Sequence, residues 1–213
     1  MTDRVQKAEA FLRKTLFSAD SILRTSSEQT MYRFEHSLRV AALGQRVARA
    51  EGLDDEALAI SCLLHDLAYS VYDPVLDWRE HGRISAKLAR PFVETLGFPV
   101  ETQLAVLAGI ALHVDLRAEP PYERTVFTQS VCDCDNIDRF DAHRLFDNLF
   151  DFDFRARTRQ ERLAFIREQL RLAEGAEQFR MATPTAQALW LDRLAFQREY
   201  FTRLQSQIAL APD

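Results

Sequence analysis

A histidine and an aspartate, both able to bind a metal ion, stand side by side at positions 65 and 66, at the end of an apolar run. Neighbouring side chains on a helix point about 100° apart. His65 and Asp66 could therefore hold one ion from two directions, or the carboxylate could reach across to a second ion. Aspartate is rarely buried unless it is paired or ligating. Taken alone, the pair fits equally simple roles, such as a helix-end cap or a surface salt bridge.

Further histidines recur on apolar stripes of predicted helices. His36, His81 and His113 each stand at one end of such a stripe, as His65 does. Because an apolar stripe faces the interior, the four imidazoles could project into one shared space. A single histidine so placed is more often an ordinary core residue, and His143, which also lies on a stripe, is given no metal role. The recurrence of the pattern in order along the chain is what favours a site.

The elements that must position these residues are predicted to be helices, so we expect an all-α fold. Six glycines and seven prolines leave few turn signals, and alternating β-branched runs are absent. Another helix, capped by Asp54 or Asp55, leads to His65. Residues 141–154 are rich in Phe and Asp and are left unassigned. The remaining helices are predicted over residues 1–17, 28–51, 78–96, 100–115, 123–140, 158–174 and 184–208.

Local signals refine some of these helices. Ser26 is expected to cap the helix over 28–51, which carries two apolar stripes. One stripe, with Met31 and Phe34, is the expected core face, and the other carries His36 at its N-terminal end. Pro91 predicts a kink or an earlier end in the helix over 78–96. Gly109, one turn before His113, is expected to leave room beside that imidazole.

Bulk composition limits the classes of function. The chain has 213 residues, enough for one domain with a substantial core, and a formal net charge of −5. This charge disfavours an extended nucleic-acid surface, although a local arginine cluster could still bind a small phosphorylated ligand. The three cysteines are too few for a disulfide framework and are interpreted as small buried side chains. No stretch resembles a membrane span or a signal peptide, so we expect a cytoplasmic protein.

We expect one metal-binding helical domain over residues 1–154. Residues 155–213 are rich in Arg and Gln, carry no reactive cluster, and are predicted to be a C-terminal helical extension that packs on the same domain. These amphipathic helices offer enough surface for a homodimer, although the oligomeric state stays open.

Five short words, found in order between residues 30 and 140, resemble the HD-domain superfamily of metal-dependent phosphohydrolases. They combine a histidine, a His-Asp pair, two further histidines and a late aspartate, as in dinuclear members of that superfamily. The words are EHSLRV at 35–40, LHDL at 64–67, EHGRISA at 80–86, GIALH at 109–113 and CDNID at 134–138.

The resemblance implies two divalent transition-metal ions. One would be bound by His36, His65, Asp66 and Asp135, and Asp66 would bridge to a second. The second ion would be held by His81 and His113. Imidazole and carboxylate ligands suit Fe, Mn, Ni, Co or Zn.

Some features depart from the pattern or leave choices open. The acid and the Gly-Lys that often follow the His-Asp pair are missing, since Leu67 and Ala68 stand there. Asp135 is chosen over Asp133 only from its place in the family's word, and Asp133 could instead support a ligand or lie in solvent. Arg39, one turn after His36, is the candidate for contacting phosphate or orienting Asp66, with an ordinary ion pair as the alternative. Weaker candidates are Arg83, Lys87, Arg117 and Arg139.

The resemblance implies hydrolysis of a phosphoester or nucleotide phosphate by metal-activated water, with Asp66 and Arg39 as the central residues. The substrate would be small and phosphorylated, such as a nucleotide. Two other functions stay open on the same ligand set. One is an HD-fold di-iron oxygenase, and the other is a regulatory module that binds metal without turnover.

Overall fold

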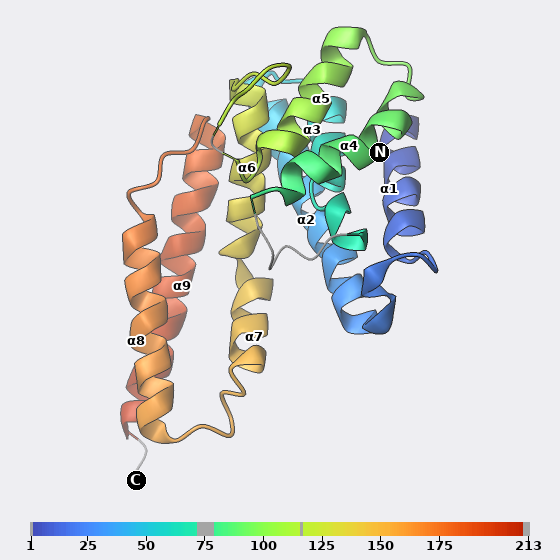
Figure 1. Ribbon diagram of the computed structural model, residues 1–213. Coiled ribbons are helices and arrows are strands. Elements are labelled where there is room, and N and C mark those ends of the chain that lie inside the picture. Colours follow the sequence, from blue (N-terminus) through green and yellow to red (C-terminus); the bar gives the residue numbers. More distant parts are fainter. Residues whose placement is uncertain (1, 72–78, 116, 211–213) are drawn as a thin grey trace. The chain divides into compact units, whose positions relative to one another are not determined.

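Helices make up all the regular structure in the part of the chain that the computed structural model describes, residues 2–71, 79–115 and 117–210 (Figure 1). The predicted all-α fold is confirmed. By its internal contacts the chain divides into two compact units, Met1–Asn136 and Ile137–Asp213. This division falls within helix α6 (Val126–Arg139). The expected organisation into residues 1–154 and 155–213 stays a prediction.

The first unit contains five complete helices within the described ranges, and the start of α6. Short 3-10 helices, η1 (Ile22–Thr25) and η2 (Leu67–Ser70), precede α2 and follow α3. The complete α-helices are α1 (Asp3–Leu16), α2 (Ser27–Glu51), α3 (Asp55–Leu64), α4 (His81–Glu94) and α5 (Val100–Leu112).

Helix α3 is the centre of this unit. Every residue from Ala57 to Leu64 is buried, and the helix packs against α1, α2, α4 and α5 (Figure 1). A helix that is apolar on all sides is stable only in the interior of a protein. The residues that follow α3, His65 and Asp66, are therefore delivered into the core and not to the surface.

Two glycines allow the neighbouring helices to approach α3 closely. A Cβ atom on Gly44 of α2 would lie 2.8 Å from the Sγ atom of Cys62. A Cβ atom on Gly109 of α5 would lie 2.9 Å from Cγ2 of Val131 and 3.4 Å from the Ser61 side chain. Gly109 thus allows α3 and α6 to pack closely against α5. From the sequence it was expected to leave room beside His113.

Helix boundaries follow the local signals in most places. Ser26 accepts a hydrogen bond from the Gln29 amide at 3.2 Å, and Asp54 accepts one from the Ala57 amide at 2.9 Å, so both caps are confirmed. Pro91 lies inside α4, which ends at Glu94. The expected core position of Met31 is wrong: this side chain is 41% exposed, while Phe34 is buried. Most of the predicted loop after Tyr69 lies outside the described residues.

The second unit contains α7 (Ala142–Asp151), α8 (Arg159–Ala176) and α9 (Pro184–Leu210). Helix α7 accounts for most of the segment that the sequence left unassigned. Helices α8 and α9 pack side by side as an antiparallel pair (Figure 1). The core of this unit contains Leu145, Ile166, Phe201 and Ile208.

Among the helices in the described ranges, none is long and apolar enough to span a bilayer.

Candidate metal centre

The first unit brings the six predicted ligands together from five helices. His36 lies in α2, His65 and Asp66 follow α3, His81 begins α4, His113 follows α5, and Asp135 lies in α6. All six residues are buried. Their approach to one another depends on long-range packing, because the ligands come from five helices that are separated along the chain by loops.

The four imidazoles form two close pairs. The Nε2 atoms of His36 and His65 are 3.2 Å apart, and those of His81 and His113 are 3.0 Å apart. Each pair therefore points its ring nitrogens at one small region, as histidines do when they share an ion.

Backbone carbonyl groups fix the orientation of one histidine in each pair. The Nδ1 atom of His65 lies 2.7 Å from the Cys62 carbonyl oxygen, and that of His113 lies 2.7 Å from the Ile110 carbonyl oxygen. A carbonyl oxygen can only accept a hydrogen bond, so Nδ1 carries the proton and donates. In the neutral ring this leaves the Nε2 lone pair facing the cluster. Such a backbone contact is the usual support of a metal-binding histidine.

Asp66 lies between the two pairs and turns one oxygen toward each. Its Oδ1 atom is 3.3 Å from Nε2 of His81 and 3.7 Å from Nε2 of His113. Its Oδ2 atom is 3.5 Å from Nε2 of His65 and 3.7 Å from Nε2 of His36. A carboxylate placed in this way has the geometry required to bridge two ions.

Asp135 completes the half of the cluster that contains His36 and His65. Its Oδ1 atom is 3.1 Å from Nε2 of His36 and 3.7 Å from Nε2 of His65. Asp133 is also buried, but it belongs to none of the ligand groups found among the described residues. The geometry therefore favours Asp135, which the sequence could not separate from Asp133 by helical periodicity.

The six residues fit a divalent transition metal. They form three overlapping groups, within each of which the ligand atoms lie no more than 4.8 Å apart. The groups are His36 with His65 and Asp66; His65 with His113 and Asp135; and Asp66 with His81 and His113. Neutral imidazole and carboxylate are the ligands that Fe, Mn, Ni, Co and Zn accept.

Burial and neighbouring charges shift the pKa values of two of these residues. Burial, which disfavours the charged ring, lowers the pKa of His65 to about 4, despite the attraction of Asp66. Burial alone would raise the pKa of Asp66. The neighbouring groups outweigh burial and hold the Asp66 pKa well below its usual value; they are, first, His65, and then His113, His81 and Arg33. Near neutral pH, therefore, the imidazole of His65 is neutral and Asp66 is a carboxylate anion. These are the forms that bind metal ions.

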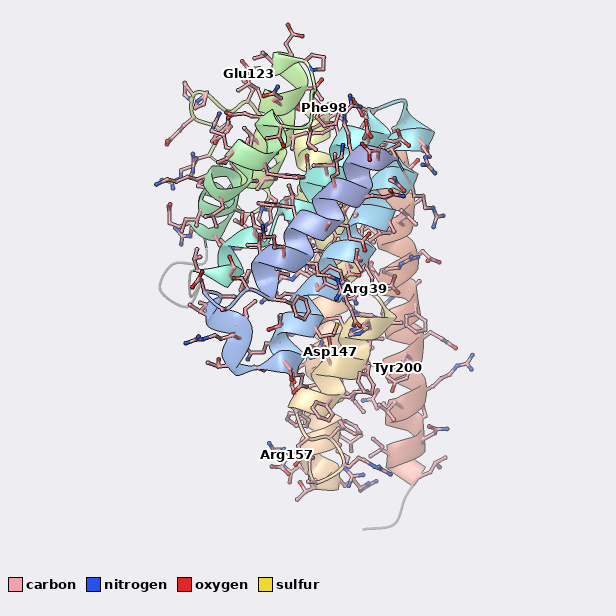
Figure 2. The ribbon with its side chains drawn as sticks, turned by 90° about the vertical axis from the view of Figure 1, so that its right-hand side faces the viewer. Arg39, Phe98, Glu123, Asp147, Arg157 and Tyr200 are labelled. Atoms are coloured by element: carbon pink, nitrogen blue, oxygen red, sulfur yellow. The ribbon has the colours of Figure 1, made fainter. Side chains whose placement is uncertain are left out.

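Arg33 is a functional candidate that the sequence reasoning missed. Its Nη1 atom donates to Oδ2 of Asp66 at 2.9 Å, and its guanidinium group lies 3.5 Å from the centre of the Tyr69 ring. Arg33 thus makes a direct contact with Asp66, and the orienting role suggested for Arg39 stays a prediction. Arg39 lies half-buried in α2 (Figure 2), and its contact with phosphate stays a prediction. The available signal was position: Arg33 stands one helical turn before His36, as Arg39 stands one turn after it.

The thiols near the cluster belong to none of the ligand groups found among the described residues. The hydrogen bond to Cys62 and burial raise the pKa of Cys134 well above its usual value. Burial, with the nearby Asp135 and Asp133 charges, raises the pKa of Cys132 to about 12. A metal ligand must be the thiolate. Cys62 and Cys134 are buried small side chains, as expected, and Cys132 is half-buried.

Comparison with known proteins identifies relatives of this fold. A family model described as "HD domain" matches residues 33–143, which include all six predicted ligands. A search of curated protein sequences found no significant match.

Several solved structures resemble the chain along most of its length. A predicted HD superfamily hydrolase from an uncultured Thermotogales bacterium has a TM-score of 0.65 and 18% identity, covering 95% of this chain and 91% of its own. A HD-superfamily hydrolase from Bacillus thuringiensis has a TM-score of 0.67 and 17% identity, covering 98% of both chains. Bacillus subtilis YpgQ in complex with ADP has a TM-score of 0.63 and 19% identity, covering 96% of this chain and 94% of its own.

We expect the metal-free protein to lose stability as the pH falls from 6.5 to 4. In this window the unfolded chain binds a proton at histidine, with a reference pKa of 6.5, that folded His65, with a pKa of about 4, does not bind. Stability therefore falls with the pH, by up to about 3 kcal/mol for this group alone. The lowered pKa of Asp66 adds a further loss at still lower pH.

Urea denaturation of chelator-treated protein at several pH values measures this dependence. The His65→Asn variant should show a shallower loss of stability between pH 6.5 and 4. The His143→Asn variant is the control, because His143 lies in the second unit and is 39% exposed. Equal slopes for wild type and His65→Asn would contradict the assignment.

Proposed function

The chain belongs to the HD-domain family, and we propose that it is a metal-dependent phosphohydrolase that cleaves a phosphoester or a nucleotide phosphate. The observation that carries the proposal is the position of Asp66 between two histidine pairs, with one carboxylate oxygen turned to each. Two ions are proposed: one with His36, His65, Asp66 and Asp135, and one with Asp66, His81 and His113.

Bound divalent ions would supply an acidified water and positive charge against a phosphoryl group. The protein's own residues have separate tasks around them. His65 and His113 are held in one tautomer by backbone carbonyls, so their Nε2 atoms need no reorientation. Asp66 stays ionised through its neighbours, and its burial excludes bulk water from the carboxylate.

Arg33 is proposed to contact the substrate phosphate or to hold Asp66 in place for it. Its side chain is 25% exposed, whereas that of Asp66 is 5% exposed, so Arg33 keeps some contact with solvent while its Nη1 atom holds the buried carboxylate. Tyr69 packs on the guanidinium plane and limits its motion. Arginine suits this position because its planar fork can meet carboxylate and phosphate oxygens together.

A nucleotide is the proposed substrate class within the small phosphorylated molecules. Support comes from the complex of Bacillus subtilis YpgQ with ADP, a structure that shares the fold. The names of the two other similar structures, both HD-superfamily hydrolases, support hydrolysis. The net charge of −5 agrees with a small anionic ligand bound at a local site better than with a nucleic-acid surface.

We expect purified protein to contain transition metal and to hydrolyse phosphoesters. Chelation should abolish the activity, and addition of Mn²⁺, Ni²⁺, Co²⁺ or Fe²⁺ should restore it. Metal analysis, followed by assays with p-nitrophenyl phosphate, bis-p-nitrophenyl phosphate and nucleoside di- and triphosphates, measures both properties. Asp66→Asn should lower kcat/KM about 100-fold or more, because the loss of a supporting contact alone commonly costs 10- to 100-fold. His143→Asn is the matched control and should retain activity.

Other outcomes would overturn the proposal. Absence of bound metal, with no activity restored by any of the four ions, would exclude a metal-dependent hydrolase. Oxygen uptake and a coupled Fe(II)/Fe(III) paramagnetic signal without phosphoester cleavage would instead indicate the di-iron oxygenase. Metal binding without any turnover would indicate the regulatory module.

We expect Arg33→Ala to lower kcat/KM roughly 10- to 100-fold, because a hydrogen bond to a charged group contributes about 1.5–3 kcal/mol. Arg33→Lys should recover part of this loss, since it keeps the charge without the fork. Steady-state kinetics of Arg33→Ala and Arg39→Ala in parallel would show which arginine acts. Arg46→Ala, on the exposed face of α2, is the control. Wild-type kinetics for Arg33→Ala would disprove the role.

A further inference from the structure

An ion pair between Arg83 and the buried Asp115 lies beside the half of the cluster that contains His81 and His113. Asp115 is 3% exposed, and its Oδ2 atom accepts a hydrogen bond from Nε of Arg83 at 3.0 Å and lies 3.0 Å from Nη2 of the same guanidinium group. Its Oδ1 atom accepts from the Arg117 amide at 2.9 Å and from Nε of Arg117 at 3.3 Å. Arg83 also donates to the Arg117 carbonyl oxygen at 3.1 Å. Asp115 and Arg83 thus tie the start of α4 to the segment after α5.

The ion pair is in register with two predicted ligands. Arg83 stands two residues after His81, and Asp115 stands two residues after His113. The same two backbone segments therefore carry both the ion pair and the pair of imidazoles whose Nε2 atoms are 3.0 Å apart. Any separation of these segments would separate the two imidazoles as well.

Gly82, between His81 and Arg83, shows how closely the segments pack. A Cβ atom on Gly82 would lie 2.7 Å from the Ala111 carbonyl oxygen and 3.1 Å from that of Ile110. It would also lie 3.2 Å from Nδ1 of His113. The Ile110 carbonyl is the group that fixes the His113 ring, so the backbone of α4 lies directly against the support of that ligand.

The other half of the cluster has two of its histidine and aspartate ligands inside helices. His36 and Asp135 lie within helices α2 and α6, and His65 lies just beyond the end of α3, in which every residue from Ala57 to Leu64 is buried. His81 is the first residue of α4, and His113 lies just beyond the end of α5. Helix ends are less firmly held than helix interiors, so ligands placed there need an additional tie.

We propose that the Arg83–Asp115 ion pair, with Gly82 beside it, is a positioning device that sets the spacing of His81 and His113 and so determines binding of the second ion. The inference rests on the two-ion centre proposed above. A ligand must be held within about half an ångström of its required position. Loss of the ion pair therefore weakens the binding of the second ion selectively. Binding of the ion at His36, His65 and Asp135 is unchanged.

The test is Mn²⁺ binding to chelator-treated full-length protein, measured by equilibrium dialysis and metal analysis. Wild type should bind two ions per chain. Arg83→Gln and Asp115→Asn should bind one ion with wild-type affinity and the second about 10- to 100-fold more weakly. Arg83→Lys keeps the positive charge but loses the planar guanidinium group. Its affinity for the second ion should therefore lie between that of these variants and that of wild type.

Controls separate positioning from general stability. Removing one partner of a buried ion pair leaves an unpaired charge, so the double variant Arg83→Gln/Asp115→Asn is included, and the metal-free thermal midpoint of every variant is measured. The matched control is Arg90→Gln/Glu94→Gln, which removes an exposed ion pair of 4.0 Å on the same helix and should keep both ions.

The outcomes separate this inference from the proposed function. Folded variants that bind both ions with wild-type affinity, or that lose both ions equally, would overturn it, as would one ion per wild-type chain. Two ions in wild type and selective loss in the variants would support it even if no phosphoester is hydrolysed, a result that would overturn only the proposed function.

Discussion

Burial of the Asp66 carboxylate is the constraint around which the first unit is organised. A buried charge is costly unless paired and hydrogen-bonded, and Asp66 is only 4% exposed. Its compensation comes from Arg33 and from four histidines, of which only His65 is close to it in sequence. The fold must therefore bring all these elements to one place before the carboxylate can be buried. Metal ions would add to this compensation, which is why a charged site can lie at the centre of a small domain.

Helix α3 makes this arrangement possible because it has no polar face. Its burial from Ala57 to Leu64 directs the chain into the core, and His65 and Asp66 follow immediately. The close contacts of Gly44 with Cys62, and of Gly109 with Val131, hold α2, α5 and α6 near enough for their side chains to reach the same point. Packing of apolar helices and chemistry of the cluster are thus consequences of the same short segment.

Much of this could be predicted from the sequence, because apolar periodicity reports which face of a helix is buried. That signal placed four histidines on inward faces, but His143 lies on such a stripe too, so the ligands were selected only by the resemblance to HD-domain proteins. Capping and helix-breaking residues indicated most helix boundaries. Neither signal could identify contacts between distant segments. Arg33 was missed because Arg33 and Arg39 each stand one helical turn from His36, and nothing in the sequence shows which of them contacts Asp66. The closest neighbours of Gly109, Val131 and Ser61, and the approach of Gly82 to His113 from a different helix, could not be predicted for the same reason.

The two halves of the cluster differ in how many of their ligands lie inside helices, and this difference has a physical consequence. Residues within packed helices, such as His36 and Asp135, are fixed by the same hydrogen bonds and apolar contacts that stabilise the domain. His81 and His113 are at helix ends, so their separation depends on local ties, of which Arg83 with Asp115 is the most extensive. If the proposed centre binds two ions, substitutions near helix ends would therefore change the number of bound ions without unfolding the domain. A variant with one ion and a variant with two would then differ in contacts that touch neither ion.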